Sequence, residues 1–192
     1  TTTIGDLLLA GARHWPQSEL LVLGQQRISY LEMADRAVEK ARALQGMGVE
    51  AGDHVGILAP NLIEVMELLF AISLSGAVAV FLNGRYKSVE LAYVVDNADL
   101  KWLFTSDRIS EHTSYIELLY AALPGLGEAE NLFALSLPCA PKLKSVVLME
   151  PTSPSGFLND TQFQTFAARI TPEQAWQRRS EVALSDPGVM MY

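Results

Sequence analysis

Residues 55–105 read VGILAPNLIEVMELLFAISLSGAVAVFLNGRYKSVELAYVVDNADLKWLFT, and this stretch decides the predicted fold. Short apolar runs in it are bounded by turn residues, as strands buried on both faces are. The runs occupy residues 55–58, 77–82 and 101–105, and segments with helical periodicity separate them at 61–73 and 88–98. The alternation of strand and helix predicts parallel strands joined by right-handed crossovers. We therefore predict an α/β fold with a layered, parallel-rich sheet flanked by helices.

Clear helix and turn signals lie before this stretch. Ser29-Tyr30-Leu31-Glu32 has the S-x-x-E form of a capping box and predicts a helix through about residue 44. Gly46 and Gly48 end that helix, because glycine adopts the left-handed conformation at low cost. The apolar runs at 20–24 and 27–29 flank a turn at Gly24, so we predict a small antiparallel hairpin near the N-terminus.

The second half of the chain continues the same organisation with longer loops. We predict helices at 115–123 and from Thr171 onward, and a strand at 145–149. The segments 124–145 and 150–160 are rich in Pro, Gly and Ser, so we predict surface loops there.

Residues 65–82, VMELLFAISLSGAVAVFL, imitate a membrane span because they contain a single charge, Glu67, in 18 residues. Against a span stand that charge, the polar break around Ser73 and the change of pattern at Gly76. We predict a buried helix, a glycine turn and a buried strand, with no membrane span.

The composition excludes several functions. The chain has 192 residues with 14 Lys+Arg and 22 Asp+Glu, a net charge of −8, which argues against nucleic-acid binding. Cys139 is the single cysteine, so no intramolecular disulfide is possible, and we predict a cytoplasmic location. The tryptophans show no clustering typical of a nucleotide-stacking platform, and we expect core packing for Trp15, Trp102 and Trp176.

Common catalytic motifs are absent from the sequence. Gly46-Met47-Gly48 does not fit a dinucleotide fingerprint and ends a helix instead of opening one. The chain has no G-x-S-x-G elbow of a hydrolase. The histidines His14, His54 and His112 stand at no metal-ligand spacing with one another or with Cys139, so we expect no metal site and nominate no catalytic residue.

Two positions carry alternatives. Asp53 and His54 precede the first buried strand, where a catalytic pair competes with a solvated turn. We favour the turn, because ligands of open α/β sheets bind beyond the carboxyl ends of strands. Arg85 follows the carboxyl end of the run at 77–82, where it could hold a phosphate or pair with Glu90.

Taken in order, five segments resemble landmarks of the adenylate-forming enzymes, which include acyl-CoA synthetases, luciferases and adenylation domains of peptide synthetases. ISYLEM (28–33) resembles T/S-Y-x-E-L, and ALQGMGVEAGDHV (43–55) resembles L-x-x-x-G-V-x-x-G-D-x-V. Pro60-Asn61 resembles the start of P-N-x-x-E, SGAVAVFLNGR (75–85) resembles A-G-A-V-x-V-P-L-N-x-R, and DPGVMMY (186–192) resembles D-x-x-x-x-x-Y. The chain departs from these patterns at His54, where the family has Arg, and at Phe81, where it has Pro.

The resemblance implies an incomplete domain. In the family, a Ser/Thr/Gly-rich phosphate loop follows the residue that matches Tyr192, and the acyl pocket and a mobile C-terminal domain with a catalytic lysine come later. We therefore expect residues 1–192 to be an incomplete N-terminal subdomain of the AMP-binding domain that ends just before the phosphate-loop motif.

The resemblance also implies a function for the parent protein, that of an ATP-dependent acid–CoA ligase. Such an enzyme uses ATP, magnesium and CoA to convert a small carboxylic acid to an acyl-adenylate and then to a thioester. The fragment itself is expected to be inactive, to bind none of these cofactors tightly and to self-associate through unpaired sheet edges. Arg85 is the one residue that we nominate as cofactor-binding, as a contact to a CoA phosphate.

Two alternatives remain. One is a fatty-acyl-AMP ligase or adenylation domain that passes its acyl group to a carrier protein. The other is a complete, non-catalytic α/β binding module.

Overall fold

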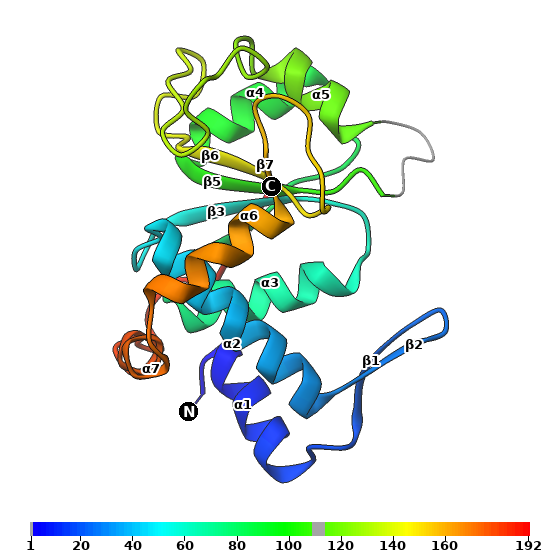
Figure 1. The fold of residues 1–192 in the computed structure, drawn as a ribbon, viewed down its shortest axis with the longest axis vertical. Coiled ribbons are helices and arrows are strands. Elements are labelled where there is room, and N and C mark those ends of the chain that lie inside the picture. The colour runs from blue at the N-terminus through cyan, green and yellow to red at the C-terminus, as the bar shows by residue number, and fades with distance from the viewer. Residues whose placement is uncertain (1, 109–113) are drawn as a thin grey trace. The chain divides into compact units, whose positions relative to one another are not determined.

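A computed structural model describes residues 2–108 and 114–192 (Figure 1). The chain divides into two compact units, and each is described by itself. The first comprises Thr1–Gly52, Asn61–Val78 and Gln164–Gly188, and the second comprises Asp53–Pro60, Ala79–Phe163 and Val189–Tyr192.

The first unit is built around one long helix, α2 (Tyr30–Met47). It packs against helices α1 (Ile4–His14), α3 (Ile63–Leu74) and α7 (Pro172–Ser180), and against the 3-10 helix η1 (Phe166–Arg169). The predicted cap is present, because the Ser29 side chain accepts a hydrogen bond from the Glu32 N–H at 3.2 Å. Gly48 ends the helix at φ 102°, in the left-handed region that favours glycine.

The predicted hairpin precedes α2 in the first unit. Strands β1 (Glu19–Leu23) and β2 (Gln26–Ser29) pair antiparallel, and Figure 1 shows the hairpin extending away from the amino end of α2.

The second unit is built on a six-stranded sheet in the order β7-β6-β5-β3-β4-β8. Its strands are β3 (His54–Leu58), β4 (Val78–Phe81), β5 (Leu100–Thr105), β6 (Ser145–Leu148), β7 (Leu158–Asn159) and β8 (Val189–Met191). The pairs β3–β5, β5–β6, β6–β7 and β4–β8 are parallel. In this register Leu58, Thr105 and Leu148 are neighbours, so the carboxyl ends of β3, β5 and β6 meet at one edge. The predicted α/β class with a parallel sheet is confirmed.

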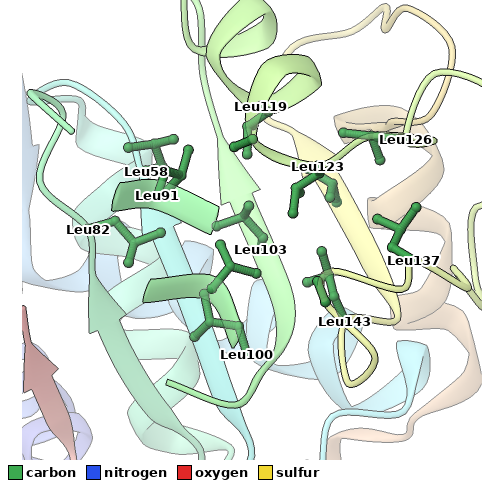
Figure 2. Close-up of a cluster of buried hydrophobic side chains, with 14 of the residues drawn as sticks. Leu58, Leu82, Leu91, Leu100, Leu103, Leu119, Leu123, Leu126, Leu137 and Leu143 are labelled. Atoms are coloured by element: carbon green, nitrogen blue, oxygen red, sulfur yellow. The ribbon is translucent and has the colours of Figure 1, made fainter. Parts of the chain in front are cut away.

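Helices α4 (Ser88–Asn97) and α5 (Tyr115–Ala122) lie side by side over one face of this sheet (Figure 1). Figure 2 shows leucines from both helices directed at leucines of β5 and of the loops beside it. Leu91, Leu103 and Leu119 are fully buried in this cluster. Burial of such side chains is the main stabilising contribution to the second unit.

The prediction for residues 65–82 is confirmed: α3 ends at Leu74, Gly76 turns the chain at φ 72°, and β4 follows. Among the residues that the structure describes, no helix has both the length and the apolar character that crossing a bilayer requires.

Five elements of the described chain were not predicted. They are α1, β7, β8, η1 and the short helix α6 (Asp160–Thr165), and β7 lies in a segment predicted to be loop. Strands β7 and β8 have two and three residues, too few for a pattern of alternation to show. Parallel neighbours in the sheet define them instead.

Candidate functional site

The loop after β4 carries Arg85. The Asn83 side-chain oxygen accepts a hydrogen bond from the Arg85 N–H at 3.0 Å, and the Asn83 carbonyl accepts one from the Tyr86 N–H at 3.1 Å. These bonds turn the chain at the carboxyl end of β4 and lead it into α4. Open α/β sheets bind ligands at this end of their strands.

The Arg85 side chain is exposed and, within residues 2–108 and 114–192, has no hydrogen-bond or ion-pair partner. The alternative pairing with Glu90 is not formed. The Glu90 carboxylate instead accepts a hydrogen bond from the Lys87 N–H at 2.8 Å at the start of α4. Arg85 and Lys87 therefore place two exposed cations beside a helix amino end, whose dipole also favours an anion. This arrangement fits a phosphate group.

A second polar group at the carboxyl edge was missed by the sequence analysis. The Ser106 hydroxyl donates a hydrogen bond to Glu150 Oε1 at 2.5 Å, and Arg108 Nε lies 3.5 Å from the same oxygen. Arg108 also donates a hydrogen bond to the Met149 carbonyl at 2.9 Å. These bonds join the loops that follow β5 and β6. The signal was present, because Ser106 and Glu150 come directly after the predicted strands.

Asp53 and His54 lie at the amino end of β3, and neither side chain has the environment of a solvated turn. Asp53 is 4% exposed, its carboxylate lies 2.5 Å from Lys101 Nζ, and it accepts a hydrogen bond from the Trp102 indole at 3.4 Å. His54 Nδ1 lies 2.6 Å from the Ala98 carbonyl. The solvated-turn interpretation is therefore wrong for Asp53, which is a buried anchor between β3 and β5.

Asp99 lies at the same end of the sheet. It adopts a left-handed conformation at φ 53°, and Lys142 Nζ lies 2.7 Å from its carboxylate. The hydrogen bond from Lys142 lowers the pKa of Asp99 below its usual value. Asp99 is therefore ionised at neutral pH and offers no proton for catalysis.

Metal-ligating side chains do not gather anywhere in the described ranges, where no group of three or more His, Cys, Asp or Glu residues could hold an ion. His112 lies outside the described residues.

Comparison with known proteins places these features in a family. The family described as AMP-binding enzyme matches residues 8–192. A 3-oxocholest-4-en-26-oate–CoA ligase of Rhodococcus rhodochrous is 27% identical over 92% of this chain and 29% of its own length. The acyl-CoA ligase sidI of Aspergillus fumigatus is 34% identical over 58% of this chain and 19% of its own.

Solved structures agree on the fold. A fatty acyl CoA synthetase of Mycobacterium tuberculosis aligns with a TM-score of 0.70 at 19% identity, covering 99% of this chain and 32% of that one. The chain thus spans about a fifth to a third of the length of these three proteins. Because the family match extends over nearly the whole sequence, the chain belongs to the AMP-binding enzyme family.

Proposed function

We propose that the protein containing this chain is an acid–CoA ligase. The supporting observation is the family match over residues 8–192, together with relatives that are named CoA ligases. In this reaction ATP activates a small carboxylic acid as an acyl-adenylate, and the thiol of CoA then takes the acyl group. Family membership also favours an enzyme over a non-catalytic binding module.

We further propose that residues 1–192 form the N-terminal part of the AMP-binding domain. Support comes from alignments that cover most of this chain but only 29–33% of the relatives. The described residues contain no metal-ligand cluster, so the proposal assigns no magnesium ligand to them.

Within this proposal, Arg85 binds a phosphate of CoA. CoA carries a 3′-phosphate and a diphosphate, and a guanidinium presents a fixed fork of donors that matches such groups. The Arg85 side chain is exposed and has no partner in the described chain, and Lys87 adds a second cation two residues later. Both stand at the carboxyl end of β4, where the backbone amides of α4 begin.

The experiment is steady-state kinetics of the full-length protein with Arg85→Ala. A charge-assisted hydrogen bond contributes about 1.5–3 kcal/mol, so KM for CoA should rise roughly 10- to 100-fold. KM for ATP and for the acid should not change. Arg13→Ala is the matched control, because Arg13 is exposed on α1 and has no partner among the described residues. An unchanged KM for CoA contradicts the assignment.

The acceptor is tested in the same assay. Thioester formation with CoA supports the ligase. Transfer to a phosphopantetheinyl carrier protein, with no transfer to CoA, would establish the alternative of a fatty-acyl-AMP ligase or adenylation domain.

Two further properties complete the proposal. We propose a cytoplasmic location, which the unpaired Cys139 supports and a fluorescent fusion would test. We also propose that the isolated 192-residue chain self-associates through β8, because β8 is an edge strand of the sheet.

A further inference from the structure

Gly84, the residue before Arg85, lies directly against the hydroxyl group of Tyr115. A Cβ atom placed on Gly84 would be 2.2 Å from Tyr115 Oη and 3.1 Å from Cζ. The backbone of Gly84 is not in the left-handed region, so its conformation does not require glycine. Glycine is required instead by the close approach of the Tyr115 ring, because any side chain at position 84 would collide with the ring hydroxyl.

Tyr115 is itself fixed in place from the carboxyl end of β5. Asp107 accepts hydrogen bonds from the Tyr115 N–H at 2.6 Å and from the Ser114 hydroxyl at 2.9 Å. Ser114 in turn caps α5 by accepting a hydrogen bond from the Glu117 N–H at 3.2 Å. The Tyr115 ring packs against the buried leucine cluster of the second unit. The ring is therefore a fixed surface, with the loop after β4 resting on its hydroxyl end.

We propose that Tyr115 is a positioning residue for Arg85. This inference rests on the proposed role of Arg85 in binding a CoA phosphate. Arg85 is exposed and its side chain has no partner in the described chain, so the place of its guanidinium depends on the backbone of residues 83–85. The Asn83 turn holds that backbone from one side, and the Tyr115 hydroxyl holds it from the other. A shift of this backbone would misalign the fork of guanidinium donors with the phosphate that it matches.

The experiment compares Gly84→Ala with Gly84→Ala/Tyr115→Phe in the full-length protein. The added methyl group must push the loop away from the hydroxyl, so KM for CoA should rise about tenfold while KM for ATP stays unchanged. In the double variant the hydroxyl oxygen is gone and the nearest ring atom is Cζ at 3.1 Å, so most of the affinity for CoA should return. Tyr115→Phe alone removes the hydroxyl but keeps the ring beside the loop, so it should raise KM for CoA, by less than Gly84→Ala does.

Gly127→Ala is the matched control. A Cβ on Gly127 would also meet a tyrosine ring, 3.3 Å from Tyr120 Cε1, but in a different loop. It should leave KM for CoA unchanged. Should Gly84→Ala fail to fold, Tyr115→Ala removes the contact without adding atoms, and it should raise KM for CoA.

A double-mutant cycle that combines Gly84→Ala with Arg85→Ala separates this inference from the proposed function. If Tyr115 acts through Arg85, Gly84→Ala adds no further loss of CoA affinity in an Arg85→Ala protein. An Arg85→Ala protein with unchanged KM for CoA defeats the proposed role of Arg85. If Arg85→Ala raises that KM but Gly84→Ala and Tyr115→Ala do not, or if the Phe substitution fails to restore it, the positioning role is wrong.

Discussion

The carboxylate of Glu67 on α3 accepts a hydrogen bond from Arg36 on α2 at 2.8 Å, although Glu67 is only 4% exposed. Lys40, also on α2 and almost buried, lies 3.3 Å from the other carboxylate oxygen. The hydrogen bond from Arg36 to Glu67 raises the pKa of Arg36 above its usual value. A carboxylate is costly to bury unless it is paired, so these cations are what permits α3 to pack on α2 through this face.

Glu67→Ala should therefore destabilise the protein strongly. The substitution leaves the Lys40 ammonium buried without its partner, and breaking a buried ion pair costs about 3–5 kcal/mol. Urea unfolding gives the free energy directly. Glu32→Ala is the control, because Glu32 forms an exposed pair with Arg36, and such pairs contribute about 0.2–1 kcal/mol. Equal losses for the two variants would contradict a special role for the buried carboxylate.

Asp99 predicts a pH dependence of stability. Its pKa is lowered in the folded protein, mainly by the hydrogen bond from Lys142. The carboxylate therefore contributes stability above its unfolded pKa of about 3.8, and loses it as the pH falls through the folded pKa. Asn also tolerates the left-handed conformation of this position, so Asp99→Asn removes the charge with little backbone strain.

Melting temperatures of the parent and Asp99→Asn proteins, measured from pH 7 to pH 2.5, test this linkage. The parent should melt slightly higher at neutral pH, and the difference should shrink below pH 3.8. Both groups are exposed, so 1 M salt should also reduce the difference at pH 7. A difference in melting temperature that persists at pH 2.5 would show that the effect does not come from ionisation of Asp99.

Asp53→Ala should lower stability without altering catalysis directly. It leaves the buried Trp102 indole N–H without its acceptor, and an unsatisfied buried group costs about 1–3 kcal/mol. Tryptophan fluorescence should change as well, since Trp102 is 2% exposed and bonded to Asp53. Under conditions where the variant stays folded, kcat should equal that of the parent. A large fall in kcat of a well-folded variant would favour the catalytic-pair alternative.

The order of strands and helices from residue 55 to residue 105 could be predicted because each element is long enough to show its own period. Its parallel pairing follows from that order, and the register of Leu58 with Thr105 agrees with it. The environment of Asp53 could not be predicted. Its partners Lys101 and Trp102 are almost fifty residues away, and they become neighbours only when β3 and β5 pair.

The environments of the tryptophans were also only partly predictable from the sequence. Trp102 is buried as expected. Trp15 and Trp176 are 60% and 53% exposed, so the prediction that they pack in the core is wrong. Trp176 contacts the guanidinium of Arg179 on its own helix instead. At the candidate site, the position of Arg85 after a strand was visible in the sequence. The contact between Gly84 and Tyr115 was not visible there, because a glycine before an arginine gives no indication of which ring lies against it.

The edge strand β8 gives the last prediction. It pairs with β4 on one side only, and Met191 is 82% exposed. Unpaired strand edges promote association between chains, and lysine on an edge strand opposes it. We expect the isolated 192-residue chain to show concentration-dependent association by sedimentation, and Met191→Lys to shift it toward monomer. Val89→Lys, at a side chain 79% exposed on α4, should leave association unchanged. A parent chain that sediments as a monomer throughout the concentration series would contradict the role of β8.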